Sequence, residues 1–181
     1  MEMFIVINTD RLLIRLLEMQ DMDDFFAYRS MPEVYQYQGW KPTVNAQAED
    51  FIIKNVSICL NTPNTWLQLA ICLKDGTLIG DIGIHFMEDD FQAEIGYTLS
   101  LAYQGNGYAF EAVKAVLDYL FTSLLKHRVT ASVDPENMKS IMLLERIGFR
   151  KEAHFRKSYH TEDKWLDDCI YAMLKEEWIS K

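Results

Sequence analysis

The sequence predicts a mixed α/β fold with about seven strands and about four helices, as a single domain over residues 1–181. A length of 181 residues suits one domain. Segments with apolar residues at helical spacing alternate with β-like runs along the chain. Strands joined by short turns fill the first half, and one strand–helix–strand crossover follows them. An antiparallel first half with a single crossover indicates a mixed sheet.

The N-terminal third contains one predicted strand and two predicted helices. In order, these elements are a strand over Arg11–Leu17, a short helix over Met22–Arg29, an aromatic-rich connection over Pro32–Pro42 and a longer helix over about Val44–Leu60. The apolar residues of the longer helix recur at helical spacing, namely Ala48, Ile52, Val56 and Cys59. Pro63 lies just beyond its predicted end, where proline is common because it cannot continue a helix.

Three strands are predicted in the centre of the chain. They cover Trp66–Leu73, Leu78–Met87 and Gln92–Ser100. The first two are separated by Asp75 and Gly76, a dipeptide that favours the tight turn of a β-hairpin. The acidic segment 88–90 leads from the second strand to the third. We therefore expect these strands to form the antiparallel part of the sheet.

The second half contains two predicted helices and three predicted strands. They cover, in order, the helix Ala109–Leu124, the strand His127–Val133, the helix Met138–Ile147 and the strands Phe149–Lys157 and Leu166–Leu174. The first of these helices has a continuous apolar face, made by Phe110, Val113, Val116, Leu117, Leu120, Phe121 and Leu124. Gly148 directly follows the second helix, at a position where glycine commonly ends a helix.

Composition and charge exclude several classes of protein. The net charge of −9 repels nucleic-acid backbones and suits a cationic ligand better. The chain has no run of about eighteen apolar residues, and its N-terminus lacks the basic segment of a signal peptide. We therefore expect no nucleic acid, no membrane association and a cytoplasmic location. The three cysteines are odd in number and widely spaced, which favours reduced thiols, and no metal site is expected.

The stretch Leu101–Val113 places two glycines, Gly105 and Gly107, directly before a predicted helix. The dinucleotide pattern G-x-G-x-x-G requires a third glycine where Phe110 stands, and no P-loop pattern occurs. Glycines nevertheless let a backbone approach an anion closely, and a helix N-terminus offers free N–H groups and a positive dipole end. The alternative is a tight strand-to-helix turn that binds no ligand.

The same stretch resembles the Q/R-x-x-G-x-G/A signature of the GCN5-related N-acetyltransferases, the GNAT family, with Gln104, Gly107 and Ala109 at its defining positions. The segment 137–149, NMKSIMLLERIGF, is similar to a pattern of the ribosomal-protein (RimJ/RimL-like) branch of that family. The opening segment 9–21 and the closing segment 167–178 also resemble this branch. The resemblance covers nearly the whole chain, from about residue 9 to residue 178.

This resemblance implies a twisted mixed sheet that splays between two parallel strands, here Glu94–Leu99 and Arg128–Val133. In the family, the pantetheine arm of acetyl-CoA lies in that gap and the pyrophosphate sits on the glycine turn. The residues implied for the turn are Gln104, Gly105, Asn106, Gly107, Tyr108 and Ala109. The implied activity is transfer of an acetyl group from acetyl-CoA to a primary amine, of a protein N-terminus or a small molecule, by direct attack. A non-catalytic CoA-binding module is the alternative, and a homodimer is left open.

Acetyl transfer to an amine needs a base for the amine, a donor to the thioester oxygen and a proton for the departing thiolate. Glu94 is the predicted base, because it is a charged residue in an otherwise apolar strand and members of the family carry a glutamate in a similar setting. Strand alternation places Glu94, Gly96 and Thr98 on one face. The alternative for Glu94 is a solvent-facing strand residue. The resemblance also implies that a bulge, eased by Gly96, turns a backbone N–H of Tyr97, Thr98 or Leu99 toward the thioester.

Asn137 and Ser140 lie at the start of the helix Met138–Ile147. Asn137 is well suited to capping that helix, whereas the resemblance implies a hydrogen bond to pantetheine. Ser140 lies one turn along and is the predicted proton donor to the thiolate, in the place of the tyrosine that many family members use. The alternative for Ser140 is a simple hydroxyl in the first turn.

Aromatic residues crowd the connection between the first two predicted helices, and they include Tyr35, Tyr37 and Trp40. Core packing is one explanation for them. In the family this connection forms one wall of the acceptor pocket, and aromatic faces suit an amine. Tyr37 and Trp40 are therefore the predicted acceptor-side residues.

Overall fold

The computed structural model describes residues 5–56, 59–161 and 164–180, and its centre is one eight-stranded mixed sheet. The strands are β1 (Val6–Asn8), β2 (Leu12–Leu16), β3 (Thr65–Leu73), β4 (Leu78–Phe86), β5 (Gln92–Leu99), β6 (Arg128–Val133), β7 (Arg150–His160) and β8 (Trp165–Leu174). Their order across the sheet is β1-β2-β3-β4-β5-β6-β8-β7. The expectation of about seven strands missed β1, which has three residues and is too short to show an alternating pattern.

Six helices accompany the sheet in the described part of the chain, where about four were expected. They are α1 (Met22–Arg29), α2 (Pro32–Tyr35), α3 (Asn45–Val56), α4 (Tyr108–Asp118), α5 (Met138–Ile147) and α6 (Lys175–Ile179). The two additional helices, α2 and α6, have four and five residues, so neither shows a helical period in the sequence. The last predicted turn of α3 includes residues 57–58, which lie outside the described residues.

The ends of α4 and α5 follow the local sequence signals. α5 begins after its cap Asn137 and ends at Gly148, whose φ of 108° is left-handed, as predicted for a terminal glycine. α4 continues into a π-helical stretch over Tyr119–Ser123, so the helix predicted to reach Leu124 is correct in extent.

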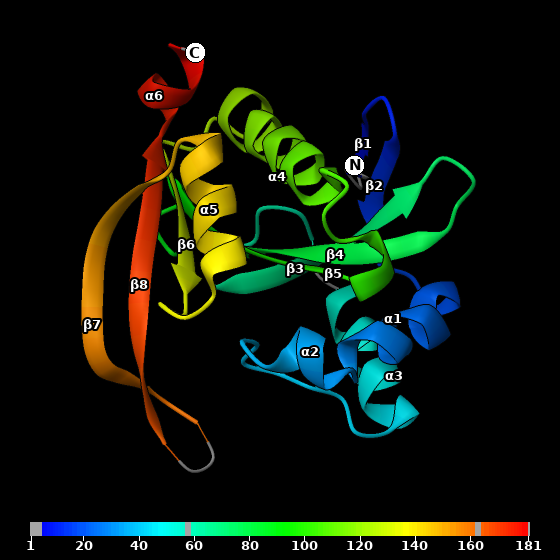
Figure 1. Ribbon diagram of the computed structural model, residues 1–181. Helices are drawn as coiled ribbons and strands as arrows, with labels where there is room; N and C mark the ends of the chain where they lie inside the picture. The colour runs from blue at the N-terminus through cyan, green and yellow to red at the C-terminus, as the bar shows by residue number, and fades with distance from the viewer. Residues whose placement is uncertain (1–4, 57–58, 162–163, 181) are drawn as a thin grey trace.

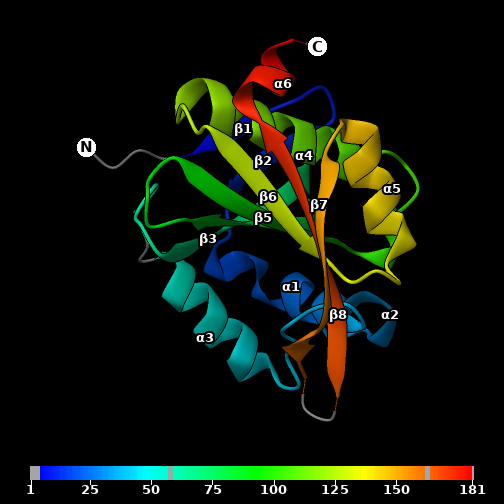
Figure 2. The ribbon, with the colours of Figure 1, turned by 90° about the vertical axis from the view of Figure 1, so that its left-hand side faces the viewer.

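Helices cover both faces of the sheet. α4 and α5 lie against one face, and α1 to α3 lie against the other (Figure 1 and Figure 2). The face under α4 and α5 holds the larger core, in which Val113 and Leu144 are fully buried. On the opposite face, Phe25 of α1 and Ile52 of α3 are fully buried in a smaller core with residues of β3 and β4.

The sheet splays between β5 and β6, as predicted. The parallel pairing joins Gln92–Glu94 to Arg128–Thr130 and then stops. Beyond it, β5 continues to Leu99 along β4, while β6 continues to Val133 along β8. Two strands that each follow a different neighbour must diverge, so a gap opens between their C-terminal halves.

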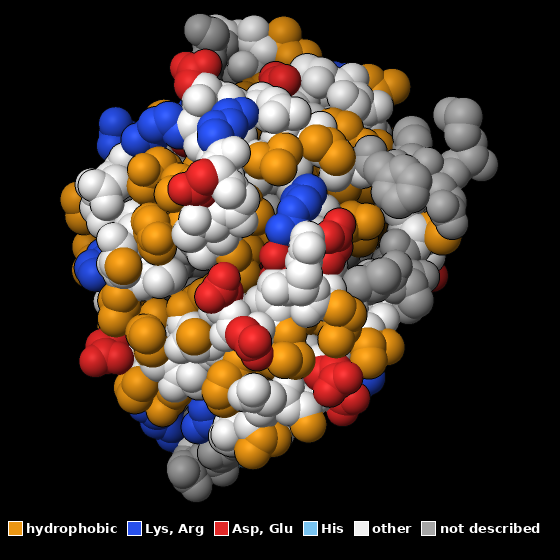
Figure 3. Space-filling model, turned by 90° about the vertical axis from the view of Figure 1, so that its right-hand side faces the viewer, with side chains coloured by type: hydrophobic (Ala, Val, Ile, Leu, Met, Phe, Trp, Pro, Cys, Tyr) orange, Lys and Arg blue, Asp and Glu red, His pale blue; other side chains and the backbone are white. Residues whose placement is uncertain are grey.

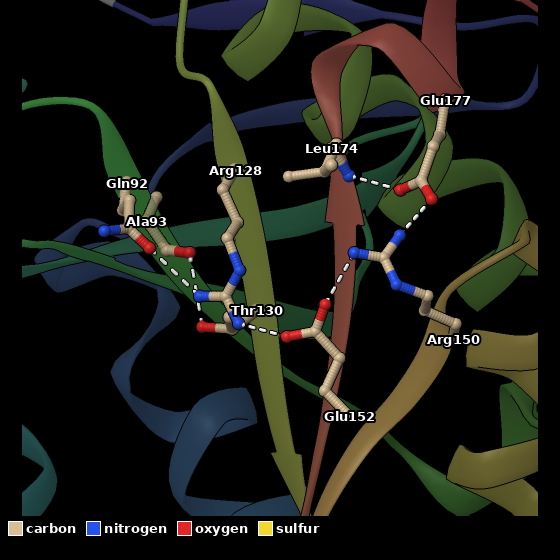
Figure 4. Close-up of polar contacts among 8 residues, drawn as sticks. All are labelled: Gln92, Ala93, Arg128, Thr130, Arg150, Glu152, Leu174 and Glu177. Atoms are coloured by element: carbon tan, nitrogen blue, oxygen red, sulfur yellow. Dashed lines mark hydrogen bonds and ion pairs between the residues drawn. The ribbon is translucent and has the colours of Figure 1, made fainter.

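A polar network joins the strands at the closed end of this gap (Figure 4). Arg128 of β6 donates to the Gln92 side chain of β5 at 3.0 Å and to Glu152 of β7 at 2.6 Å. Arg150 joins Glu152 at 2.6 Å and also pairs with Glu177 of α6. Each of these partly exposed ion pairs contributes little to stability by itself. Together they join β5, β6, β7 and α6 where the parallel strands are still paired.

Candidate active site

A cavity of about 570 Å³ lies at the open end of the splay. Most residues predicted for the site line it, namely Tyr37, Tyr97, Thr98, Leu99, Gln104, Gly105, Gly107, Tyr108, Ala109, Asn137 and Ser140. Three predicted residues do not line it: Glu94, Asn106 and Trp40. The cavity therefore unites the glycine turn, the end of β5 and the first turn of α5.

The glycine turn is shaped by its backbone. Gly105 and Gly107 have φ values of +79° and +80°, in the left-handed region that favours glycine. A Cβ on Gly105 would meet no atom within 4 Å, and one on Gly107 would meet only the Arg11 Nη2 atom, at 3.5 Å. The protein's own packing therefore leaves space beside both glycines. Gly107 is also the N-cap of α4, so the first N–H groups of that helix lie at this turn.

Two amide side chains stabilise the glycine turn through hydrogen bonds. The Gln104 Nε2 donates to the Leu99 carbonyl at 3.1 Å, and its Oε1 accepts from Lys139 of α5 at 3.3 Å. Asn106 Nδ2 lies 3.2 Å from the carbonyl oxygen of Gln104, within the turn itself. Asn106 thus stabilises the turn from outside the cavity, whereas Gln104 links the turn to both β5 and α5.

The hydrogen-bond alternation of β5 shows which backbone groups face the gap. The Ser100 N–H donates to Ile79 at 2.9 Å, on the β4 side, and the Met87 N–H donates to Gln92 at 3.2 Å. Because antiparallel pairs alternate, the even-numbered groups of β5 point to β4, and those of Tyr97 and Leu99 point to the side from which β6 has diverged. Of the three N–H groups predicted as donors to the thioester oxygen, those of Tyr97 and Leu99 therefore remain candidates.

The predicted bulge at Gly96 is wrong. β4 and β5 keep one unbroken register from Ala93 to Leu99, and the register shift of this region lies instead between Ile71 and Cys72 of β3. No bulge is needed to turn a β5 N–H toward the gap, because β6 has already diverged from this part of β5. The Thr98 N–H faces β4, but its hydroxyl is buried, lacks a hydrogen-bond partner and lies on a residue that lines the cavity.

Ser140 lies against a tyrosine that sequence spacing could not associate with it. The Ser140 Oγ and the Tyr97 Oη are 2.7 Å apart, and either can donate. Burial raises the pKa of Tyr97 to about 12, so its hydroxyl keeps its proton at neutral pH. The first turn of α5 and the end of β5 thus present two hydroxyls at the cavity, although 43 residues separate them.

Asn137 caps α5, as one of its two interpretations required. Its Oδ1 accepts from the Ser140 N–H at 3.2 Å. The cap uses the oxygen of the amide and leaves the Nδ2 donor outside it, and Asn137 is also one of the residues that line the cavity.

Replacing Asn137 by Asp separates the two roles. Asp keeps the capping oxygen, so the melting temperature should stay near that of the wild type, whereas the amide donor is lost and the KM for acetyl-CoA should rise. Asn137→Ala is the matched control, because it removes the cap as well and should cost about 1 kcal/mol of stability. An Asp variant with wild-type kinetics would leave Asn137 as a cap alone.

Glu94 lies on the face of β5 that carries Thr98, opposite the face of Tyr97. Between Glu94 and Thr98 stands Gly96, where a Cβ would meet nothing within 4 Å. Gly96 thus leaves open space between Thr98, which lines the cavity, and Glu94, which does not. The Glu94 Oε2 is 4.0 Å from the His85 Nδ1, and its side chain is 26% exposed. Burial, and secondarily the charge of Asp168, raise the pKa of Glu94.

The two aromatic residues predicted for the acceptor side have different environments. Tyr37 lines the cavity, and its hydroxyl donates to the Glu136 carbonyl at 3.4 Å, across from the start of α5. Trp40 is partly buried and stacks on Phe25 and Phe51, with ring centroids 6.0 and 4.6 Å apart, against the smaller core. The core-packing interpretation therefore describes Trp40, and of the two residues predicted for the acceptor side it is Tyr37 that lines the cavity.

Comparison with known proteins identifies the family. A model of the acetyltransferase (GNAT) domain matches residues 11–150, more than half of the chain. The chain belongs to the GNAT family. YnaD of Bacillus subtilis, an N-acetyltransferase described as uncharacterized, is 34% identical over 95% of this chain and 98% of its own length. The alanine N-acetyltransferase of ribosomal protein uS5 from Escherichia coli is 32% identical over 46% of this chain and 43% of its own.

Solved GNAT structures share the whole architecture. A GNAT acetyltransferase from Bacillus anthracis superposes with a TM-score of 0.87 at 31% identity, covering 96% of this chain and 100% of that one. A spermidine N-acetyltransferase from Vibrio cholerae, in complex with CoA and spermine, has a TM-score of 0.82 at 22% identity, over 94% of this chain and 99% of that one. The first likeness agrees with the family, and the second shows the fold alone. This chain is accordingly an acyltransferase of the GNAT type.

Over the face in Figure 3, Asp and Glu side chains are spread among hydrophobic ones, and Lys and Arg side chains lie mainly at the upper left and near the centre. The chain as a whole carries a net charge of −9. Within residues 5–56, 59–161 and 164–180, no helix combines the length and apolar character needed to span a membrane.

Proposed function

We propose that this protein transfers the acetyl group of acetyl-CoA to a primary amine by direct attack. The observation that carries the proposal is that one cavity joins the left-handed glycine turn to the Tyr97–Ser140 hydroxyl pair. The turn offers open space beside Gly105 and Gly107 and the free N–H groups of α4, a combination that suits a diphosphate. Acetyl-CoA supplies the activated acetyl group when bound.

The residues around the cavity divide the chemistry among them. The N–H groups of Tyr97 and Leu99 point into the gap and would stabilise negative charge on the thioester oxygen. Ser140, hydrogen-bonded to Tyr97, would donate a proton to the departing thiolate. Glu94 would accept the proton of the amine through a water over Gly96, since its side chain lies beyond the cavity wall.

Charges along the cavity wall support binding of the CoA phosphates at the glycine turn and of the amine near Tyr37. Lys139 and Arg146 line the cavity beside the glycine turn, whereas Glu33 and Glu136 line it beside Tyr37. An anionic ligand would be favoured at the first end and a cationic amine at the second. The acceptor class, a protein N-terminus or a small-molecule amine, is tested by the following assay.

The direct test measures thiol release from acetyl-CoA in the presence of short peptides, diamines and other small amines. Release that depends on any amine supports the transferase. The alternative is a CoA-binding module without catalysis, which would bind CoA and release no thiol with every amine of the panel.

The glycine turn makes its own prediction. Gly107→Ala should weaken CoA binding at least about tenfold, or about 1.4 kcal/mol, because a methyl group would stand where the diphosphate must approach. The measurement is a titration of the folded variant with CoA. Gly76→Ala is the matched control, since Gly76 also has a positive φ, of 93°, with no neighbour within 4 Å, and lies in the β3–β4 turn. Both variants place an alanine at a positive φ, and equal CoA affinities would contradict the proposed anion site.

A further inference from the structure

An acidic residue lies in the first turn of α4, where the proposed function requires an anion to bind. Glu111 follows Gly107 by four residues, and its N–H donates to the Gly107 carbonyl at 3.1 Å. A carboxylate in the first turn stabilises a helix through the helix dipole, but it also repels a second anion at the same end. A diphosphate can bind there only if this charge is compensated.

The turn between β1 and β2 compensates it. The Thr9 hydroxyl donates to Glu111 Oε1 at 2.6 Å, and the Arg11 N–H donates to the same oxygen at 3.0 Å. The Arg11 guanidinium pairs with Oε2 through both Nε and Nη2, each at 2.6 Å. Burial opposes ionisation of Glu111, but the hydrogen bonds from Thr9 and Arg11 outweigh it and hold the pKa of this carboxyl below its ordinary value. Glu111 is therefore a fully charged, fully partnered carboxylate at neutral pH.

The same guanidinium also holds the glycine turn. The Arg11 Nη1 donates to the Asn106 carbonyl at 3.0 Å, and the guanidinium carbon lies 4.5 Å from the centre of the Tyr108 ring. Its Nη2 is the atom that a Cβ on Gly107 would meet at 3.5 Å. One side chain from near the N-terminus therefore contacts the residues on both sides of Gly107, as well as the carboxylate behind them.

We propose that Arg11 is a positioning residue of the anion site, which neutralises Glu111 and fixes the Asn106–Tyr108 backbone so that a diphosphate can bind at the N-terminus of α4. The proposal rests on the proposed binding of CoA. It extends the site to the β1–β2 turn, about a hundred residues away in the chain. The side chain of Arg11 is 47% exposed, so its electrostatic effect should weaken as salt rises.

The test is a cycle of three variants, Arg11→Ala, Glu111→Gln and the double variant, each titrated with CoA at low and at moderate salt. Arg11→Ala should bind CoA about tenfold more weakly at low salt, since it leaves an uncompensated carboxylate beside the anion. Glu111→Gln should bind at least as tightly as the wild type. The double variant should recover most of the lost affinity, because the repelling charge is gone. In kinetics, Arg11→Ala should raise the KM for acetyl-CoA and leave the KM for the amine unchanged.

Two further variants keep the result interpretable. Arg150→Ala removes an arginine of similar exposure, 44%, from an ion-pair network distant from the turn, and should leave CoA affinity unchanged. Arg11→Lys keeps the charge without the planar fork, and its CoA affinity should fall between those of Arg11→Ala and the wild type. Wild-type affinity in Arg11→Ala, or a double variant as weak as Arg11→Ala, would overturn the proposal while the transferase stands. A wild-type protein that does not bind CoA would remove the proposed function, and this inference with it.

Discussion

Replacing Glu94 by Gln is expected to lower kcat by about two orders of magnitude or more, because a general base contributes typically about 10²–10⁴-fold. Gln keeps the shape of the side chain and removes its ability to accept a proton. CoA affinity should change little, since Glu94 does not line the cavity that holds the glycine turn. The measurements are kcat from thiol release with a saturating amine and a separate CoA titration.

The pH dependence of the residual rate gives a second readout. An amine attacks only when neutral, and its pKa is about 10.4 for a lysine-like amine and about 7.7–8.0 for an α-amine. The rate of the Gln variant should therefore climb between about pH 6 and pH 10, as more of the acceptor loses its proton without help. A variant with wild-type kcat and a wild-type pH profile would make Glu94 a structural residue of β5.

The raised pKa of Glu94 also predicts how the variant's stability changes with pH. A raised pKa means that the folded state binds this proton more tightly than the unfolded chain, so the ionised carboxylate costs stability at high pH. Gln cannot ionise and removes that cost. Its melting temperature should equal or exceed that of the wild type at about pH 8, and the difference should vanish below the unfolded pKa, near pH 4. A Gln variant with a lower melting temperature than the wild type at pH 8 would indicate that its lost activity reflects damage to the fold.

Replacing Asp81 by Ala is expected to destabilise the protein by about 3–5 kcal/mol, the usual cost of removing one partner of a buried ion pair. Asp81 is fully buried and accepts from Tyr28 at 2.6 Å and from the Arg29 Nε at 3.0 Å. Gln68 also donates to it. The substitution would leave the buried cation of Arg29 without its carboxylate. For a chain of this length the loss corresponds to a melting temperature lower by roughly 6–20 °C.

Thermal or denaturant unfolding measures this effect, and His154→Ala is the control. It removes an exposed pair with Asp167 at 2.7 Å and should cost no more than about 1 kcal/mol. Equal losses in the two variants would contradict the assignment of a structural role to the buried network. The network also reaches the cavity, because the Arg29 Nη1 donates at 3.2 Å to Gln38, which lines it.

Local sequence signals predicted much of the fold. α1 and α5 have the predicted bounds, and the glycine turn lies directly before α4 as expected. These features depend on neighbours within a few residues: apolar spacing, a capping Asn and glycines that adopt a positive φ. The short elements β1, α2 and α6 were missed because three to five residues carry no measurable period. Their formation depends on the strands and helices against which they pack.

The composition of the candidate site was partly predictable and its geometry was not. Local sequence was enough to predict the order of the longer elements, to recognise the family signature, and to find a glutamate in β5 and a serine in the first turn of α5. The folded structure alone pairs Tyr97 with Ser140, packs Trp40 against the smaller core and shows that divergence of β6, rather than a bulge, frees the β5 amides. It also brought Arg11 to Glu111. Such contacts join residues far apart in the chain, and their distances depend on strand order and register, for which local propensity carries no signal.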